Sequence, residues 1–309
     1  MKIKSLKELQ RKLHSKKECR EYLEGLRWQG IPKCPHCNCQ TDKHYRLKNK
    51  GEFNGLYKCR ECKKRFTVTM GTMFEGSKIP LEDWFFAIGI FLSHKKGISS
   101  IQLSKDIDVT QKTAWFMLNR IRHNMNRKAN FFFNDVTQVD ETYIGGKNKN
   151  RFKRNQGRSL KQKTPVVGLL SHDKVYTIVV PNVSGRILKG IIYSLVVEGT
   201  TVVTDGLRSY RGLDKHYNHQ IVDHDSKRYV NEEGYHTNGI EGFWSQLKRG
   251  LKGIYHVVSP KHLHKYCDEF AYRYNTRFMS DMERFTEFIA TTYRRLSYYD
   301  LRFTRFLEI

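Results

Sequence analysis

The sequence predicts a multi-domain α+β protein in which differently patterned regions follow one another. Residues 31–78 are rich in cysteine, lysine and glycine and contain two closely spaced cysteine pairs. Residues 79–130 carry apolar side chains at helical spacing. From about 131 to 280, runs of valine, isoleucine and threonine alternate with helical segments, which is typical of a mixed α/β domain. We expect a helical segment at 1–30 and a tail at 281–309.

The composition indicates a folded protein with a polyanionic partner. Apolar residues make up 39% of the 309 residues, which favours a packed core over disorder. Lysine and arginine number 56 against 31 aspartates and glutamates, a formal net charge of +25. An excess of this size is typical first of nucleic-acid-binding proteins and second of proteins that bind anionic membranes. No apolar run approaches the roughly 18–20 residues that a membrane span needs.

The N-terminal stretch 1–30 predicts short helices. Leu6, Leu9 and Leu13 recur at helical spacing, and the stretch is basic and amphipathic. It lacks the apolar core of a secretion signal. We therefore expect a cytoplasmic protein.

Residues 31–78 contain two Cys-x-x-Cys knuckles, CPHC at 34–37 and CREC at 59–62. The sulfurs of one such pair can reach a single tetrahedral ion, and two pairs complete a closed structural Zn²⁺ site. Twenty-one residues separate the knuckles, and the segment HYRLKNKGEFNGLYKC predicts a strand, a turn and a strand. The expected zinc ligands are Cys34, Cys37, Cys59 and Cys62.

The remaining cysteines are predicted to play lesser parts. The chain has seven cysteines, an odd number, and in a cytosolic protein metal binding is favoured over disulfides. His36 and Cys39 are further ligand types beside the knuckles and leave the fourth ligand open. Cys19 and Cys267 are predicted to be simple buried thiols.

The segment GISSIQLSKDIDVTQKTAWFMLNRIR at 97–122 predicts a helix-turn-helix. One helix is expected from Ser99 to Asp106, followed by a tight turn at 107–109 and a second helix capped by Thr110. The side chains expected to face inward are Trp115, Leu118 and Ile121. In such motifs the second helix enters the major groove of DNA. The candidate base-contacting residues are Gln111, Lys112 and Thr113; the alternative is a helical hairpin that packs only for stability.

Two carboxylates interrupt apolar strand patterns in the mixed α/β region. In QVDET, the alternation points Val139 and Glu141 to one face and Asp140 to the other. In VVTDG, Asp205 ends an apolar strand, the position where ligands bind in open α/β sheets. Taken alone, Asp205 could cap the following helix and Asp140 could pair with a lysine. With a third carboxylate, the two aspartates would form a site for hard divalent ions such as Mg²⁺.

The stretch HTNGIEGFWSQLKRG at 236–250 could supply that third carboxylate. On a helix, Asn238, Glu241 and Lys248 share one face, while apolar side chains repeat on a second, buried face. The alternative is an ordinary capped helix, with Asn238 as N-cap and Glu241 at the third helical position of a capping box. That alternative leaves the two strand-borne aspartates and Lys248 unexplained.

The ordered motifs VDET, VVTDG and HTNGIEGFWSQLKRG resemble those of bacterial insertion-sequence transposases of the DDE type. The resemblance is greatest to the group with an N-terminal zinc ribbon and a terminal signature similar to YHVVSPKHLHKYCDEFAYRYNTR at 255–277. It extends from about Cys34 to Arg277. Glu241 follows Asp205 by 36 positions, similar to the interval usual in the family.

The resemblance implies an RNase H-like catalytic domain and assigns roles residue by residue. Asp140, Asp205 and Glu241 match the triad that binds Mg²⁺ or Mn²⁺. Lys248 matches the basic residue that holds transposon-end DNA, and Arg249 beside it is a further candidate. Asn238 is the alternative third residue, since some relatives use an asparagine.

The expected function is therefore transposition by a nucleoid-associated protein. The protein would bind the terminal inverted repeats of its element, cleave the ends and join them to target DNA, as a homo-oligomer on DNA. The alternatives are a zinc-ribbon transcription regulator without catalysis and a related nuclease or resolvase that lacks strand transfer.

The basic, polar segment 145–163 is predicted to be a loop between strands.

Overall fold

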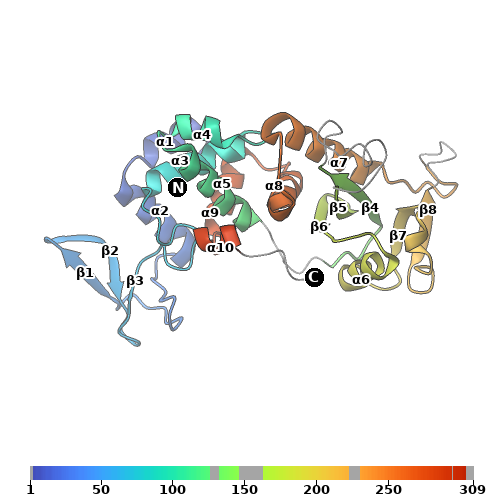
Figure 1. Ribbon diagram of the computed structural model, residues 1–309. Coiled ribbons are helices and arrows are strands. Elements are labelled where there is room, and N and C mark those ends of the chain that lie inside the picture. The colour runs from blue at the N-terminus through green and yellow to red at the C-terminus, as the bar shows by residue number, and fades with distance from the viewer. Residues whose placement is uncertain (1–2, 126–131, 146–162, 223–229, 294, 304–309) are drawn as a thin grey trace. The chain divides into compact units, whose positions relative to one another are not determined.

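The chain divides into two compact units in the computed structural model (Figure 1). One unit comprises Met1–Met125 and Phe278–Arg305, and the other comprises Asn126–Arg277 and Phe306–Ile309. The residues that the structure describes are 3–125, 132–145, 163–222, 230–293 and 295–303. The predicted loop at 145–163 lies outside these residues except at its two ends. None of the described helices combines the length and the apolar character that a membrane span requires.

The first unit begins with two capped helices, α1 (Leu6–Lys12) and α2 (Lys16–Trp28). Ser5 accepts a hydrogen bond at the start of α1, and Ser15 forms a capping box with Glu18 at the start of α2. Both helices contact α3 (Leu81–Ser93), an apolar helix that forms the centre of this unit. The helices predicted within residues 1–30 are thus confirmed.

A three-stranded antiparallel sheet follows α2, formed by β1 (Tyr45–Asn49), β2 (Glu52–Lys58) and β3 (Arg65–Phe66). The predicted strand, turn and strand correspond to β1 and β2. The sheet buries little apolar surface of its own: Tyr57 and Phe66 stack on each other and contact the Trp28 ring of α2. Such a small core leaves the module dependent on other stabilisation, such as a bound metal.

Helices α4 (Ser100–Asp106) and α5 (Gln111–Met125) pack against each other across a tight turn. Ser99 caps α4, and the hydroxyl of Thr110 accepts a hydrogen bond from the amide of Thr113 at the start of α5. Between the helices, Asp108 adopts a left-handed conformation with φ +48°, which reverses the chain. The helix bounds and both caps agree with the sequence. Leu118 and Ile121 are buried as expected, but Trp115 is only half-buried.

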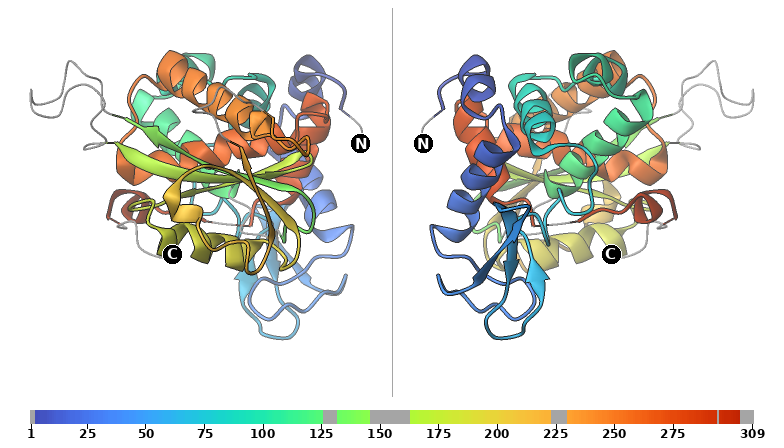
Figure 2. Two further views of the ribbon diagram at one scale, coloured as in Figure 1. Left: turned by 90° about the vertical axis from the view of Figure 1, so that its right-hand side faces the viewer. Right: turned by 90° about the vertical axis from the view of Figure 1, so that its left-hand side faces the viewer.

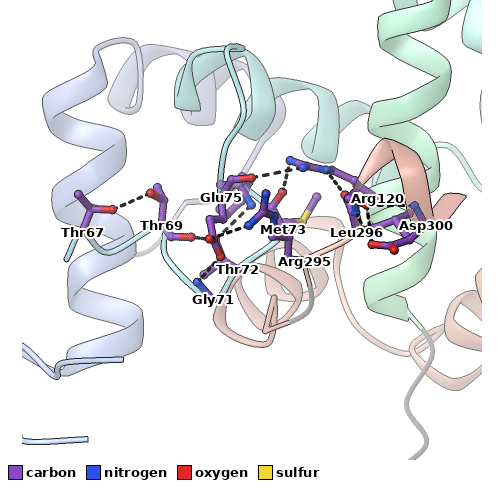
Figure 3. Close-up of polar contacts among 12 residues, drawn as sticks. Thr67, Thr69, Gly71, Thr72, Met73, Glu75, Arg120, Arg295, Leu296 and Asp300 are labelled. Carbon is purple, nitrogen blue, oxygen red and sulfur yellow. Dashed lines mark hydrogen bonds and ion pairs between the residues drawn. The ribbon is translucent and has the colours of Figure 1, made fainter. Parts of the chain in front are cut away.

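The C-terminal segment, which the sequence analysis treats as a tail, contributes α9 (Asp281–Ala290) and α10 (Tyr298–Phe303) to the first unit. Helix α9 starts with a capping box and packs on α2 and α3. Figure 3 shows how the buried guanidinium of Arg120 on α5 connects two distant segments. It donates hydrogen bonds to the carbonyls of Met73, at 2.8 Å, and Leu296, also at 2.8 Å. The segment before α10 is therefore tied to α5.

The second unit is built on a five-stranded mixed sheet. Its strands are β4 (Thr137–Ile144), β5 (Thr164–Ser171), β6 (Lys174–Val179), β7 (Thr201–Asp205) and β8 (Asn218–Val222). They lie in the order β6-β5-β4-β7-β8 (Figure 1). The pairs β4–β5 and β5–β6 are antiparallel, while β4–β7 and β7–β8 are parallel. The runs of valine, isoleucine and threonine predicted from the sequence correspond to β4, β5, β6 and β7, and β8 is an addition.

Helices cover both faces of this sheet (Figure 2). Helix α6 (Gly185–Leu195) packs on one face, against a cluster that includes Val139 and Val202. The other face is covered by α7 (Asn238–Gly250) and α8 (Leu263–Asn275). Helix α7 continues into a π-helical turn, Leu251–Tyr255. This three-layer arrangement confirms the predicted mixed α/β domain and places α7 directly over β4 and β5.

Candidate metal centres

The four cysteines of the two knuckles converge in the first unit. The Sγ atoms of Cys34 and Cys62 lie 3.7 Å apart, and those of Cys37 and Cys59 lie 3.6 Å apart. All four sulfurs lie within 4.8 Å of one another. Sulfurs bound at about 2.3 Å to one tetrahedral zinc ion are about 3.8 Å apart, so the observed cluster fits Zn²⁺ with a single closed shell. The predicted Cys₄ ligand set is confirmed as a cluster that could hold the metal.

Backbone amides support the thiolate form that zinc requires. Burial raises the pKa of Cys59, but the amides of Cys62 and Glu61, together with the neighbouring thiols of Cys37 and Cys62, lower it to about 7. Burial also raises the pKa of Cys34, to about 12, although the amides of His36 and Cys37 oppose the shift. The two knuckles therefore surround their first cysteines with N–H donors, as anionic sulfurs need.

The spare ligand types beside the knuckles have other partners. His36 Nε2 lies 3.2 Å from the carbonyl oxygen of Arg65. Cys39 forms a second group with Cys59 and with His44, a residue that sequence reasoning did not single out. Both ring nitrogens of the buried His44 are engaged: the amide of Arg60 donates to Nδ1, and Nε2 lies 3.3 Å from the carbonyl oxygen of Cys39. His44 thus links the CREC knuckle to the segment that follows the CPHC knuckle.

The two strand-borne aspartates lie side by side in the second unit. Strands β4 and β7 pair in parallel with Gln138 opposite Val203, and Asp140 and Asp205 are the residues two positions further along. Burial and the neighbouring charge of Asp205 raise the pKa of Asp140 to about 6. Asp205 Oδ1 accepts a hydrogen bond from the amide of Leu207 at 3.0 Å, but the following 3-10 helix, Arg208–Tyr210, has no side-chain cap, so the alternative in which Asp205 caps that helix is wrong. The two carboxylates therefore lie on adjacent interior strands, close enough for the charge of Asp205 to raise the pKa of Asp140.

Asp140 is held by the indole of Trp244 on α7. Trp244 Nε1 donates to Asp140 Oδ2 at 2.9 Å, so the side-chain partner that the structure gives Asp140 is not a lysine. Gly168 on β5 lies opposite Asp140, and a Cβ atom there would come within 2.6 Å of the Trp244 ring. A glycine at this position makes room for the indole that reaches Asp140.

Glu241 lies on α7, one turn before Trp244, and its charge contributes to the raised pKa of Asp140. The helix begins at Asn238, so the residue at the cap position is Thr237, and the predicted capping box of Asn238 and Glu241 is wrong. Instead, the Thr237 hydroxyl donates to Glu241 Oε1 at 3.0 Å. Among the described residues, no three carboxylate oxygens, one each from Asp140, Asp205 and Glu241, all lie within 4.8 Å of one another.

The other predicted residues of α7 are exposed. Asn238 is the first helical residue, and Lys248 lies two turns beyond Glu241 on the same helix. Arg249 follows Lys248 and donates a hydrogen bond to the carbonyl of Ser245 at 3.1 Å. The amide of Asn238 and the charges of Lys248 and Arg249 are therefore accessible to a ligand.

A fourth carboxylate near the aspartates was not among the predicted site residues. Glu141 Oε2 accepts a hydrogen bond from the hydroxyl of Tyr210, a buried residue that follows β7, at 2.9 Å. Burial, with a smaller effect from the charges of Asp205 and Asp140, raises the pKa of Glu141 to about 7, although the hydrogen bond from Tyr210 opposes the shift. The available signal was the sequence alternation, which points Glu141 towards the buried face of Val139.

These shifts predict a pH-dependent stability in the absence of added divalent ions. The folded pKa of Asp140, about 6, exceeds its ordinary value of 3.8. The protonated carboxyl therefore contributes to the stability of the fold, and this contribution is fully present below the ordinary pKa and is lost as the pH rises through about 6. Asp140→Asn removes the ionisation. We expect this variant to gain unfolding temperature relative to the parent between pH 4 and 7, in parallel thermal melts. A difference that stays constant over this range would contradict the assignment.

The candidate base-contacting residues lie in the first turn of α5. Gln111 and Lys112 are exposed, and Gln111 Nε2 donates to the hydroxyl of Ser100 at 2.7 Å. Lys112 Nζ lies 5.4 Å from the centre of the Tyr298 ring of α10. The hydroxyl of Thr113 lies 2.9 Å from that of Thr110. Only Gln111 and Lys112 present their side chains mainly to solvent.

Comparison with known proteins identifies two domains. Residues 133–275 match the family described as ISXO2-like transposase domain, and residues 14–65 match the transposase zinc-ribbon domain. The chain is similar to an uncharacterized protein in transposable element ISH50 of Halobacterium salinarum, with 26% identity over 276 residues that cover 84% of this chain and 90% of the relative. It is also similar to an uncharacterized transposase-like protein of Haemophilus influenzae, with 37% identity over 103 residues that cover 33% of this chain and 81% of the relative.

The two matched domains coincide with the two candidate centres. The zinc-ribbon match contains all four clustered cysteines, and the transposase match contains Asp140, Asp205 and Glu241. The resemblance stated from the sequence motifs is therefore confirmed at the level of the family. The chain belongs to the insertion-sequence transposases that combine a transposase zinc-ribbon domain with an ISXO2-like transposase domain.

Proposed function

We propose that the protein is a DDE-type DNA transposase that binds the terminal inverted repeats of its own element, cleaves the ends and joins them to target DNA. The observation that carries this proposal is the adjacency of Asp140 and Asp205 on parallel strands, with Glu241 on a helix packed over them. A regulator that only binds DNA has no need for two carboxylates on adjacent interior strands with a third on the helix packed over them. The mixed sheet with helices on both faces supports an RNase H-like domain.

Asp140, Asp205 and Glu241 are the residues that would hold Mg²⁺ or Mn²⁺, since hard cations prefer carboxylate oxygens. Such ions, when bound, activate a water or a 3′-hydroxyl and stabilise the leaving oxygen in phosphodiester displacement. Burial and the charge of Asp205 raise the pKa of Asp140, and a bound cation would offset that charge. We assign the third position to Glu241 rather than Asn238, because Glu241 acts electrostatically on Asp140 while Asn238 is exposed at the start of α7.

The exposed cations of α7 suit the phosphate path of the end DNA. Lys248 and Arg249 lie two turns from Glu241, on the side of the helix that is open to solvent. Neither is a metal ligand, so they would position the DNA and leave ion binding to the carboxylates. We expect the protein to act as a homo-oligomer, because the two ends of an element must be joined to one target.

The decisive experiment for this function is incubation of the purified protein with duplexes that carry its own element ends. With Mg²⁺ present, we expect cleavage at the element boundary, read on a denaturing gel, and joined products when a target plasmid is added. Cleavage without joining would support a nuclease or resolvase instead. Binding without cleavage, in Mg²⁺ and in Mn²⁺, would contradict the proposal and favour a regulator.

We further propose that α4 and α5 form a DNA-binding helix-turn-helix whose second helix reads the element ends. The capped start of α5, with its exposed Gln111 and Lys112, and the net charge of +25 support this role. Thr113 would take part through its hydroxyl. The zinc ribbon, with its clustered cysteines and basic residues, would add to the DNA-binding surface.

A salt titration with variants tests this assignment. Binding to any duplex should weaken steeply as salt increases, because bound lysine and arginine release counterions from DNA. Gln111→Ala should lower the preference for end DNA over random DNA by about tenfold, the cost of roughly one base contact, with bulk binding almost unchanged. Fluorescence anisotropy with an end duplex and a random duplex measures both the preference and the bulk binding. If Gln111→Ala and Lys112→Ala keep the parent's preference, α5 is not the reading helix.

A further inference from the structure

Helix α7 is attached to β4 at two points by side-chain hydrogen bonds. The backbone amide of Ile240 donates to Gln138 Oε1 at 3.0 Å, and the indole of Trp244 donates to Asp140 Oδ2 at 2.9 Å. Gln138 and Asp140 are two residues apart on β4 and therefore point to the same face of the sheet. Helix and strand are thus connected along one line that passes through the candidate metal site.

The spacing of these two contacts matches on both elements. Two residues of a strand span roughly 6.6 Å. The four residues from Ile240 to Trp244 span roughly 6 Å of helix. A shift of α7 by one residue would separate both pairs at once, so the contacts fix the register of the helix on the strand. Glu241 follows Ile240 directly, and its position relative to Asp140 is set by that register.

Two glycines permit the close approach. A Cβ atom on Gly239 would lie 2.8 Å from Gln138 Oε1, closer than side chains normally come. A Cβ atom on Gly168 would lie 2.6 Å from the Trp244 ring. Neither glycine has the positive φ that would otherwise explain it. Each occurs where one of the two contacts needs space.

Gln138 also replaces the missing cap of α7. The first amides of a helix have no partner within the helix, and Thr237 at the cap position forms no side-chain cap. The hydroxyl of Thr237 donates to Glu241 instead. The side chain of Gln138, 102 residues away in the sequence, accepts from the amide of Ile240 in its place.

We propose that Gln138 is a positioning residue of the metal site: it caps α7 from β4 and thereby sets the distance between Glu241 and Asp140. Gln138 is not assigned as a ligand: its carbonyl oxygen accepts from the amide of Ile240. The proposal rests on the proposed function, since it requires Asp140 and Glu241 to bind a divalent ion. It predicts that loss of Gln138 weakens ion binding more than it weakens folding.

The first test measures Mn²⁺ binding to the full chain by electron paramagnetic resonance of the free ion. Gln138→Ala should weaken Mn²⁺ binding about tenfold, the scale of losses when a residue that orients ligands is removed. End cleavage should need a correspondingly higher Mg²⁺ concentration and should recover at saturation. Gln138→Met, which keeps the side-chain volume, replaces the alanine variant if that variant lowers the unfolding temperature.

The second test is a double-mutant cycle between Gln138 and Gly239. Gly239→Ala alone should also weaken Mn²⁺ binding, because its methyl group would displace the Gln138 amide from Ile240. In the Gln138→Ala background the methyl group meets no amide, so Gly239→Ala should cost nothing further. Gly242→Ala is the matched control, since a Cβ atom there meets nothing within 4 Å. It should leave Mn²⁺ binding at the parent's level.

The outcomes separate the proposal from the function on which it rests. If Asp140→Asn abolishes Mn²⁺ binding while Gln138→Ala and Gly239→Ala leave it unchanged, Gln138 has no positioning role. Gln138 also has no positioning role if the losses of Mn²⁺ affinity from Gln138→Ala and Gly239→Ala simply add in the double variant. If Asp140→Asn leaves Mn²⁺ binding intact, the metal site itself is misassigned and the proposed function fails with it.

Discussion

Asp140→Asn is expected to lower the rate of end cleavage by about 10³–10⁴-fold, with folding and DNA binding retained. The substitution keeps the size of the side chain and an oxygen that can accept from the Trp244 indole. It removes the negative charge that a hard divalent ion requires. It also relieves the repulsion from Asp205 that raises the pKa of Asp140, so the variant should be at least as stable as the parent. Cleavage gels and thermal melts on the same preparation measure both effects.

Glu241→Gln should behave in the same way, and Asn238→Ala supplies its control. Glutamine keeps an oxygen for the Thr237 hydroxyl but lacks the charge for the ion. Asn238 starts α7 without a side-chain cap, so its loss should scarcely change the helix. If Asn238→Ala abolishes cleavage while Glu241→Gln cleaves normally, the third residue of the triad is the asparagine.

Removal of the zinc ligands is the second change with a large expected effect. Cys34→Ser or Cys62→Ser should lose the metal and unfold the ribbon, because structural Zn²⁺ contributes about 10–16 kcal/mol in small zinc modules. The apolar core of the ribbon is too small to compensate, since it consists mainly of Tyr57, Phe66 and the contact with Trp28. The second unit, with its own two apolar clusters, should keep its fold.

Elemental analysis and limited proteolysis test this expectation. The parent should carry about one zinc ion per chain, by the ligand count of a Cys₄ site. Cys39→Ser is the control: Cys39 lies beside the cluster but outside the set of four, so this variant should keep its zinc. Folded, freshly purified parent without zinc would contradict the assignment, as would loss of the metal from Cys39→Ser alone.

Local patterns were sufficient to predict much of the fold. Two Cys-x-x-Cys knuckles predict a cluster because short spacing confines two sulfurs to one ion, and the structure brings all four together. Apolar runs predict the strands β4 to β7, because each run must be buried in the folded protein. Strand β8, with the sequence NHQIV, lies at the edge of the sheet and buries little, so its pattern carries almost no signal.

Contacts between distant residues were not predictable from one sequence. Asn238 has the chemistry of an N-cap, yet the cap position of α7 is Thr237, and the amide of Ile240 donates to Gln138, a residue about 100 positions earlier. The pairing of Glu141 with Tyr210 and the packing of α9 on α2 likewise depend on tertiary structure. A partial signal existed in β4, where Gln138 and Asp140 place polar groups on one face of an otherwise buried strand. The positions of the two aspartates relative to each other could not be predicted without the order of the strands in the sheet.

The central claim is that the carboxylates of the second unit bind the ions that cleave element ends. The most direct measurement is cleavage of a labelled element-end duplex by the parent and by Asp205→Asn at increasing Mg²⁺ concentrations. The account predicts that the parent cuts at the element boundary only when Mg²⁺ is present and that Asp205→Asn, which still binds the duplex, does not cut at any concentration. Cleavage by Asp205→Asn at the parent's rate, or cleavage by the parent without a divalent ion, would contradict it.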